Sequence, residues 1–320
     1  MFKTTTVFAL SLTALIGASA QAQTDLLIGS TSASSSHYGY FVAVSKVIND
    51  SVEGVNSSVA ETGATLDNLR RISRNQIDLG LVTTNTLYDA YNGQGDFDGR
   101  PVQSKLLWVY SLAPQNVVVR SDAGVDELQQ LDGTSFNPGI RGSSTEATTE
   151  AVFTELDISP DYARGSTTDV VNAIKDNRMI GYVKSGSGLK LDASTRDIAT
   201  QTEIKILGLT DQQAKTVSEA LPQLSLVDVP ENGELNLPSY KTWGFAVGAS
   251  ASDGLSEDTA YQIVKAVMED SEQQVAAMPT LKEEGIAEMT LKYATTPLHP
   301  ATVRYLKEQG HEVPERLIGE

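Results

Sequence analysis

Short turns rich in hydroxyl side chains are the residues of this sequence best suited to chemistry. Six such turns follow short apolar runs and precede helical patterns. A helix N-terminus leaves backbone N–H groups free and carries the positive end of the helix dipole, so each turn offers donors to a small anion. The turns span residues 30–36, 62–65, 83–86, 141–145, 165–168 and 185–188.

Helix capping is the simpler explanation of any one of these turns, since Ser, Thr and Asn cap helices in proteins of every class. Six of them together favour a binding site for an anion. Our candidate ligand-binding residues from the turns are Ser34, Ser36, His37, Thr83, Thr84, Arg141, Ser143, Ser144, Thr145, Thr168, Lys184 and Ser185.

Cationic residues on the binding-side turns are informative because the chain has a formal net charge of −17. Arg141 and Lys184 are placed to pair with a carboxylate, and His37 is a weaker third. We expect Arg141 to make a two-pronged contact with a ligand carboxylate. An exposed surface position is an equally good interpretation of each cation.

Catalytic signatures are weak. No two of the three histidines, His37, His299 and His311, have metal-ligand spacing. The segment 185–188 is one residue too short for a Gly-x-Ser-x-Gly turn, and no phosphate loop occurs. We therefore expect a binding protein with no cofactor and no metal. A hydrolase that uses an unmarked serine remains the remote alternative.

The N-terminus predicts export. Lys3 precedes the apolar run 7–18, which is followed by the small-residue sites Ala18-Ser19-Ala20 and Ala20-Gln21-Ala22. This pattern is typical of a secretory signal peptide over residues 1–22, cleaved after Ala20 or Ala22, and predicts a periplasmic protein. The acidic balance argues against nucleic acid or an anionic membrane as partner. The sequence has 0 cysteines, so no disulfide can form.

The order of the patterns predicts an α/β protein of two lobes. Apolar runs at 26–30, 58–62 and 78–82 alternate with helical patterns, and a second such set begins after 105–119. We expect two mainly parallel sheets flanked by helices. Lobe I would hold residues 23–118 and 246–320, and lobe II residues 119–245. Two crossings, one of them carrying Trp243, would form the hinge, and a turn around His299 would lead into the last helix.

Three segments of the mature chain resemble a known family. The segment Ile28–Tyr38 resembles its opening "I-G-T/S … G-x-Y". The segment Ala60–Arg70, followed by Asp78–Val82, resembles "T-G-G-S-x-x-N-L … D-L-G-I-V". The segment Pro297–Gly310 resembles "H-P-G-A-x-R-Y-Y-x-E-x-G". These patterns are those of the TAXI class of solute receptors of tripartite ATP-independent periplasmic (TRAP) transporters.

The resemblance implies a two-lobed receptor that closes on a small carboxylate, glutamate-like or another organic acid, and delivers it to a sodium-coupled TRAP permease. It adds Tyr38, Thr62, Thr65 and Asn68 to the candidate ligand-binding residues. Ala64 and Ala301 stand where the patterns have glycine, so the identity of the ligand does not carry over. We expect a monomer. The alternative is the receptor of an ATP-driven importer for phosphate or another inorganic anion, which the hydroxyl-rich turns fit equally well.

Overall fold

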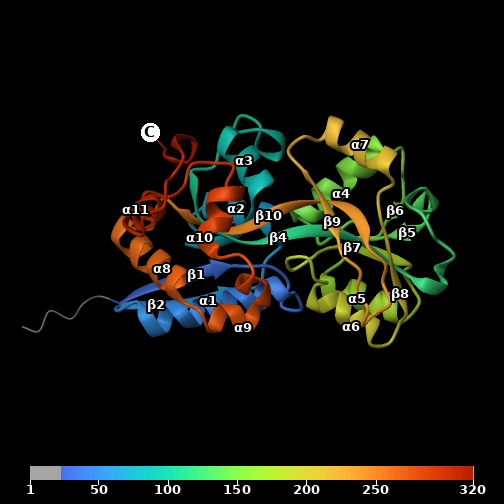
Figure 1. Ribbon diagram of the computed structural model, residues 1–320, viewed down its shortest axis with the longest axis horizontal. Helices are drawn as coiled ribbons and strands as arrows, with labels where there is room; N and C mark the ends of the chain where they lie inside the picture. Colours follow the sequence, from blue (N-terminus) through green and yellow to red (C-terminus); the bar gives the residue numbers. More distant parts are fainter. Residues whose placement is uncertain (1–22, 320) are drawn as a thin grey trace, which may run out of the picture.

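A computed structural model describes residues 23–319, so the predicted signal peptide, residues 1–22, lies outside the described residues. Two lobes lie side by side along the long axis of the molecule (Figure 1). None of the helices in the described range combines the length and the apolar character needed to cross a membrane.

An eight-stranded mixed sheet runs through both lobes. Its main path is β2-β1-β3-β10-β4-β7, with β8 also paired to β4 and β9 to β10. A separate pair, β5 and β6, lies in the second lobe. The strands are β1 (Thr24–Gly29), β2 (Val55–Ala60), β3 (Leu79–Thr83), β4 (Ser104–Arg120), β5 (Ser135–Phe136), β6 (Asp161–Tyr162), β7 (Gly181–Ser185), β8 (Ile204–Leu207), β9 (Ser225–Val229) and β10 (Tyr240–Ser252).

Strands β4 and β10 are long enough to belong to both lobes, and they connect them (Figure 1). β10 pairs with β3 through residues 247–251 and with β9 through residues 240–244. β4 pairs with β7 and β8 only from Gln115 onward. The partners therefore change near Pro114 and Gly244, which face each other in the β4–β10 ladder. We define lobe I as residues 23–114 and 245–319, and lobe II as residues 115–244.

The α/β two-lobed class predicted from the sequence is confirmed, but the pairing is less parallel than expected. β1 is parallel to β2 and β3, whereas the ladders of β10 with β3, β4 and β9, and of β4 with β7 and β8, are antiparallel. The reason is that β4 and β10 run through both lobes in opposite directions. A strand added beside either of them continues a single mixed sheet.

Helices cover both lobes, and the C-terminal tail returns to lobe I as expected. There α9 packs against α1, α10 against β4 and α11 against α8. The helices of lobe I are α1 (Ser36–Ser51), α2 (Thr65–Ile72), α3 (Thr84–Asn92), α8 (Glu257–Glu269), α9 (Gln273–Ala277), α10 (Ile286–Tyr293) and α11 (Pro300–Glu308). Those of lobe II are α4 (Ser144–Glu155), α5 (Thr167–Lys175), α6 (Ala193–Ala199) and α7 (Asp211–Ala220).

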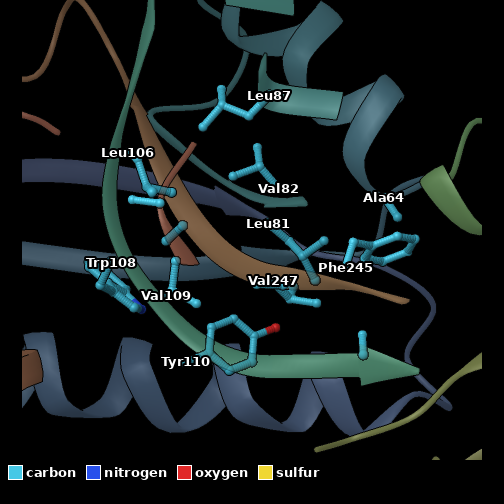
Figure 2. Packing of buried hydrophobic residues seen from close by; sticks show 14 of the residues in the cluster. Ala64, Leu81, Val82, Leu87, Leu106, Trp108, Val109, Tyr110, Phe245 and Val247 are labelled. Atoms are coloured by element: carbon cyan, nitrogen blue, oxygen red, sulfur yellow. The ribbon is translucent and has the colours of Figure 1, made fainter. Parts of the chain in front are cut away.

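A continuous hydrophobic core lies beneath the crossing strands. Trp108 and Tyr110 on β4 pack in the same cluster as Phe245 and Val247 on β10 (Figure 2). Trp243 is fully buried on β10, and its ring lies edge-on to that of Phe153 on α4 in the same lobe. Its predicted place at the crossing, away from the ligand, agrees with this position.

The last helix begins as the sequence predicted. His299 is the N-cap of α11, and its ring Nδ1 accepts a hydrogen bond of 3.2 Å from the backbone N–H of Ala301. The cap satisfies one of the free N–H groups at the helix start.

Candidate functional site

A small cavity lies where the two lobes meet, and both contribute to its wall. Its volume is about 40 Å³, which is room for about three water molecules. Lobe I contributes Thr31, Ser35, His37, Ala64, Thr65, Leu81, Thr83, Phe245 and Val247. Lobe II contributes Ile140, Ser143, Ser144, Thr145, Lys184 and Ser185.

Strand ends and helix starts position the polar half of this wall. Ser35 is the N-cap of α1, Thr65 is the first residue of α2, Thr83 is the N-cap of α3 and Ser143 is the N-cap of α4. Four helices therefore direct their N-termini towards one small volume. Their dipoles favour negative charge there.

Thr65 has a side chain available to a ligand. It is 1% exposed, and its hydroxyl oxygen has no hydrogen-bond partner in the described part of the chain. A buried hydroxyl without a partner costs about 1–3 kcal/mol. A solute in the cavity that bonds to Thr65 would recover that energy.

Ala64, just before Thr65, has a backbone conformation that favours glycine. Its φ is 67° and its ψ −147°. A side chain at this conformation is strained by about 1–3 kcal/mol. This explains why the pattern that the segment 60–70 resembles has glycine at this position.

Direct hydrogen bonds close the lobes on the α4 side of the cavity. Ser144 Oγ of lobe II lies 2.6 Å from Thr83 Oγ1 and 2.7 Å from Thr86 Oγ1 of lobe I. The backbone N–H of Leu66 donates to the carbonyl of Gly142 across the same boundary at 3.0 Å. The conformation described is therefore a closed one.

Lys184 is the one cationic side chain among the residues that line the cavity in the described range. It is 8% exposed. Its Nζ donates to Ser35 Oγ of lobe I at 3.2 Å and lies 3.7 Å from Oδ1 of Asp192, which is fully buried. Burial opposes ionisation of Asp192, but Lys184 and hydrogen bonds from Ser194 outweigh burial and hold its pKa below the usual value.

His37 is held on both sides of its ring. Nδ1 lies 3.0 Å from the Tyr110 hydroxyl and Nε2 lies 3.0 Å from the Gly186 carbonyl. Burial lowers the pKa of His37 to about 4, so the ring is neutral at neutral pH. In this state His37 offers the cavity a polar wall and no charge.

Half of the predicted ligand-binding residues meet at this cavity. They are His37, Thr65, Thr83, Ser143, Ser144, Thr145, Lys184 and Ser185. The structure does not place the other half in the wall; these are Ser34, Ser36, Tyr38, Thr62, Asn68, Thr84, Arg141 and Thr168.

Thr62 and Asn68 require a correction of role, because their polar atoms hold the fold. Asn68 Nδ2 donates to the carbonyls of Ser30 and Leu81 at 2.9 Å each. The Thr62 hydroxyl is within 2.7 Å of both Asn68 Oδ1 and the Ser30 carbonyl. Both side chains therefore tie α2 to the ends of β1 and β3.

Two glycines leave the space that Asn68 fills. Gly29 of β1 and Gly80 of β3 face each other in the parallel ladder. A Cβ on Gly29 would lie 2.6 Å from Asn68 Oδ1, and one on Gly80 would lie 3.1 Å from Asn68 Cβ.

Arg141, which was predicted to pair with a ligand carboxylate, does not line the cavity in this conformation. Arg141 and Thr168 are exposed. The Arg141 carbonyl lies against Gly63, where an added Cβ would come within 2.9 Å of it. The residue thus contributes backbone to the contact between the lobes, and its side chain is exposed.

The remaining four predicted residues lie outside the cavity wall, and three of them have other hydrogen-bond partners. Ser36 contacts Asp192 and Ala193 of lobe II, and Ser34 Oγ lies 3.1 Å from Ser32 Oγ. Thr84 Oγ1 donates to the Ala246 carbonyl at 3.4 Å. Tyr38 is half-buried on α1.

Sequence reasoning missed the apolar wall and Asp192. The apolar wall is formed by Leu81, Phe245 and Val247. They belong to continuously apolar strands, in which the sequence does not distinguish a side chain that faces a cavity from one that faces the core. Asp192 had a detectable signal, because Asp followed by Ala193-Ser194 is a helix-capping pattern. Its contact with lobe I has no local signal.

Several solved structures align with most of this chain. A putative L-cystine ABC transporter from Listeria monocytogenes aligns with a TM-score of 0.51 and 11% identity, over 85% of this chain and 98% of that one. The ligand-binding component of an ABC-type import system from Staphylococcus aureus aligns with a TM-score of 0.49 and 13% identity, over 93% and 97%. The alkanesulfonate-binding protein of Xanthomonas axonopodis pv. citri aligns with a TM-score of 0.46 and 13% identity, over 93% and 96%.

A family model covers nearly the whole of the described chain. It matches residues 28–310, from within β1 to just beyond α11. The matched range includes both lobes and every residue that lines the cavity. The chain belongs to the NMT1-like family.

Proposed function

We propose that the protein is a periplasmic solute-binding receptor that captures a small organic acid between its lobes and delivers it to a membrane transporter. The observation that carries this proposal is the convergence of the starts of α2, α3 and α4 on one hydroxyl-lined cavity between the lobes. The predicted signal peptide supports export. The fold shared with the import components named above supports capture of a solute.

The size of the cavity limits what the closed conformation can hold. A space of about 40 Å³ accepts about three water molecules or a few non-hydrogen atoms. A solute as large as glutamate requires the lobes to close less far than they do here. The ligand thus sets how far the lobes close.

Binding without catalysis is part of the proposal. A serine nucleophile needs a base within hydrogen-bond reach. Both ring nitrogens of His37, the histidine in the cavity wall, lie against the Tyr110 hydroxyl and the Gly186 carbonyl. This arrangement supports a positioning role for His37.

The transporter that receives the solute has two candidates. The sequence patterns at 28–38, 60–82 and 297–310 favour a sodium-coupled TRAP permease of the TAXI class. The name of the Listeria monocytogenes structure that shares the fold, an ABC transporter, favours an ATP-driven importer. An inorganic anion such as phosphate is the ligand that accompanies this second candidate.

Mass spectrometry of the solute that copurifies with the periplasmic protein tests the proposal. Thermal-shift measurements should then show stabilisation by organic acids and none by phosphate or sulfate. Stabilisation by phosphate alone would favour the second candidate, and the absence of any bound anion would refute the proposal. Uptake into vesicles that contain a candidate permease, driven by a sodium gradient or by ATP, identifies the partner.

A further inference from the structure

Asp192 makes a connection between the lobes that the proposed function does not use. It is the N-cap of α6 in lobe II and is fully buried. Its Oδ2 accepts hydrogen bonds from Ser35 Oγ at 2.9 Å and from the backbone N–H of Ser36 at 2.8 Å, both at the start of α1 in lobe I. Ser36 Oγ in return accepts a hydrogen bond of 2.8 Å from the backbone N–H of Ala193. The helix starts of α1 and α6 thus cap each other across the cleft.

This geometry needs a negative charge. The N-terminus of α1 meets Asp192 Oδ2, and Lys184 Nζ lies 3.7 Å from Asp192 Oδ1, so two positive groups meet in a buried space. The Asp192 carboxylate is the group that offsets them. Its Oδ1 also accepts from Ser194 N–H at 3.0 Å and Ser194 Oγ at 2.6 Å, so both of its oxygens are in use.

Asp192 balances the positive charge in the wall of the adjoining cavity. Ser35 and Lys184 belong to its wall, and Asp192 lies directly behind them. The charge of Lys184 is therefore matched within lobe II before any solute arrives, and in the closed conformation the donors at the start of α1 are occupied as well. The starts of α2, α3 and α4, with their hydroxyls, remain for one anionic group.

We propose that Asp192 is a specificity-determining residue: its carboxylate fills the second anion position of the cleft, so the receptor selects solutes with one carboxylate against those with two. This inference rests on the proposed function, because it concerns the charge of the solute bound in the same cavity. A second ligand carboxylate would meet a fixed buried negative charge and a lysine that is already paired. An amide of the same shape would meet no such repulsion.

Substitution of Asp192 isolates the charge. Asp192→Asn keeps the size and one acceptor oxygen but leaves Lys184 unbalanced, and Asp192→Ser retains a good N-cap for α6 if the first variant fails to fold. The matched control is Asp197→Asn on the same helix, where an exposed carboxylate pairs with Lys175 on the surface. The control makes the same change in net charge away from the cavity.

Calorimetry with two isosteric pairs of solutes, succinamate against succinate and glutamine against glutamate, tests the inference at pH 7.5. The wild type and Asp197→Asn should prefer the amide member of a pair by at least tenfold. Asp192→Asn or Asp192→Ser should shift that ratio at least tenfold towards the dicarboxylate.

An unchanged ratio in the Asp192 variants, or a wild type that prefers the dicarboxylate, would overturn the inference and leave the proposed function standing. If the wild type binds none of the four solutes, the inference fails. The proposed function is then judged by the wider screen of organic acids and by the copurified solute.

Discussion

Asn68→Ala should lower the free energy of unfolding, because the Asn68 side chain holds the fold together. Asn68 is fully buried. Its amide connects three segments: α2 through its own backbone, the end of β1 through Ser30, and β3 through Leu81. Removal of the side chain leaves those two carbonyls and the Thr62 hydroxyl with fewer partners.

The magnitude follows from the contacts. Three hydrogen bonds of 2.7–2.9 Å are lost, each with a net contribution of about 1 kcal/mol. The space between Gly29 and Gly80 that the amide fills becomes a small void. We therefore expect the free energy of unfolding to fall by about 3–4 kcal/mol, since the void adds to the lost hydrogen bonds.

Urea unfolding followed by circular dichroism, without ligand and with a common slope for both proteins, measures this loss. Asn172→Ala is the matched control, because Asn172 is exposed on α5, and it should change stability by no more than about 0.5 kcal/mol. A loss below about 1 kcal/mol for Asn68→Ala would refute the reasoning, since the buried hydrogen bonds would then contribute nothing net.

Four further changes test other parts of the structure. Ser144→Ala removes two bonds between the lobes and should weaken solute affinity by about 1–3 kcal/mol in calorimetry, whereas Thr154→Ala on the exposed face of α4 should not. Because the folded pKa of His37 is about 4, the unfolded chain binds the extra proton first, and stability should fall by about 3 kcal/mol from pH 7 to pH 4; urea titrations of His37→Gln that keep the same slope with pH would contradict this. Ala64→Gly should raise the free energy of unfolding by about 1 kcal/mol by relieving the backbone strain, and a loss of stability would show that the strain is absent. His299→Ala should lower the melting temperature through the loss of about 1 kcal/mol from the cap of α11, and His299→Asn should restore it.

The sequence by itself determined the class of the fold and the ends of its elements. Alternation of short apolar runs with helical patterns is a local property, so it predicted the α/β class and the return of the tail to lobe I. The caps at His299 and Ser143 also follow from local rules, because a hydroxyl or ring nitrogen can reach a free N–H within three residues. The same rules located half of the residues that line the cavity.

The tertiary structure alone decided which polar groups face the cavity and which face the core. Thr62 and Asn68 have the same types and spacing whether they bind a solute or two backbone carbonyls, and only the approach of β1 and β3 directs them inward. The pairing of Asp192 with Ser35 joins residues 157 positions apart, and no local pattern encodes a contact that forms only when two lobes close. Arg141 and Lys184 are both cations on binding-side turns. Lys184 is buried because its strand, β7, pairs with β4 inside the crossing, while Arg141 lies on an exposed turn before α4.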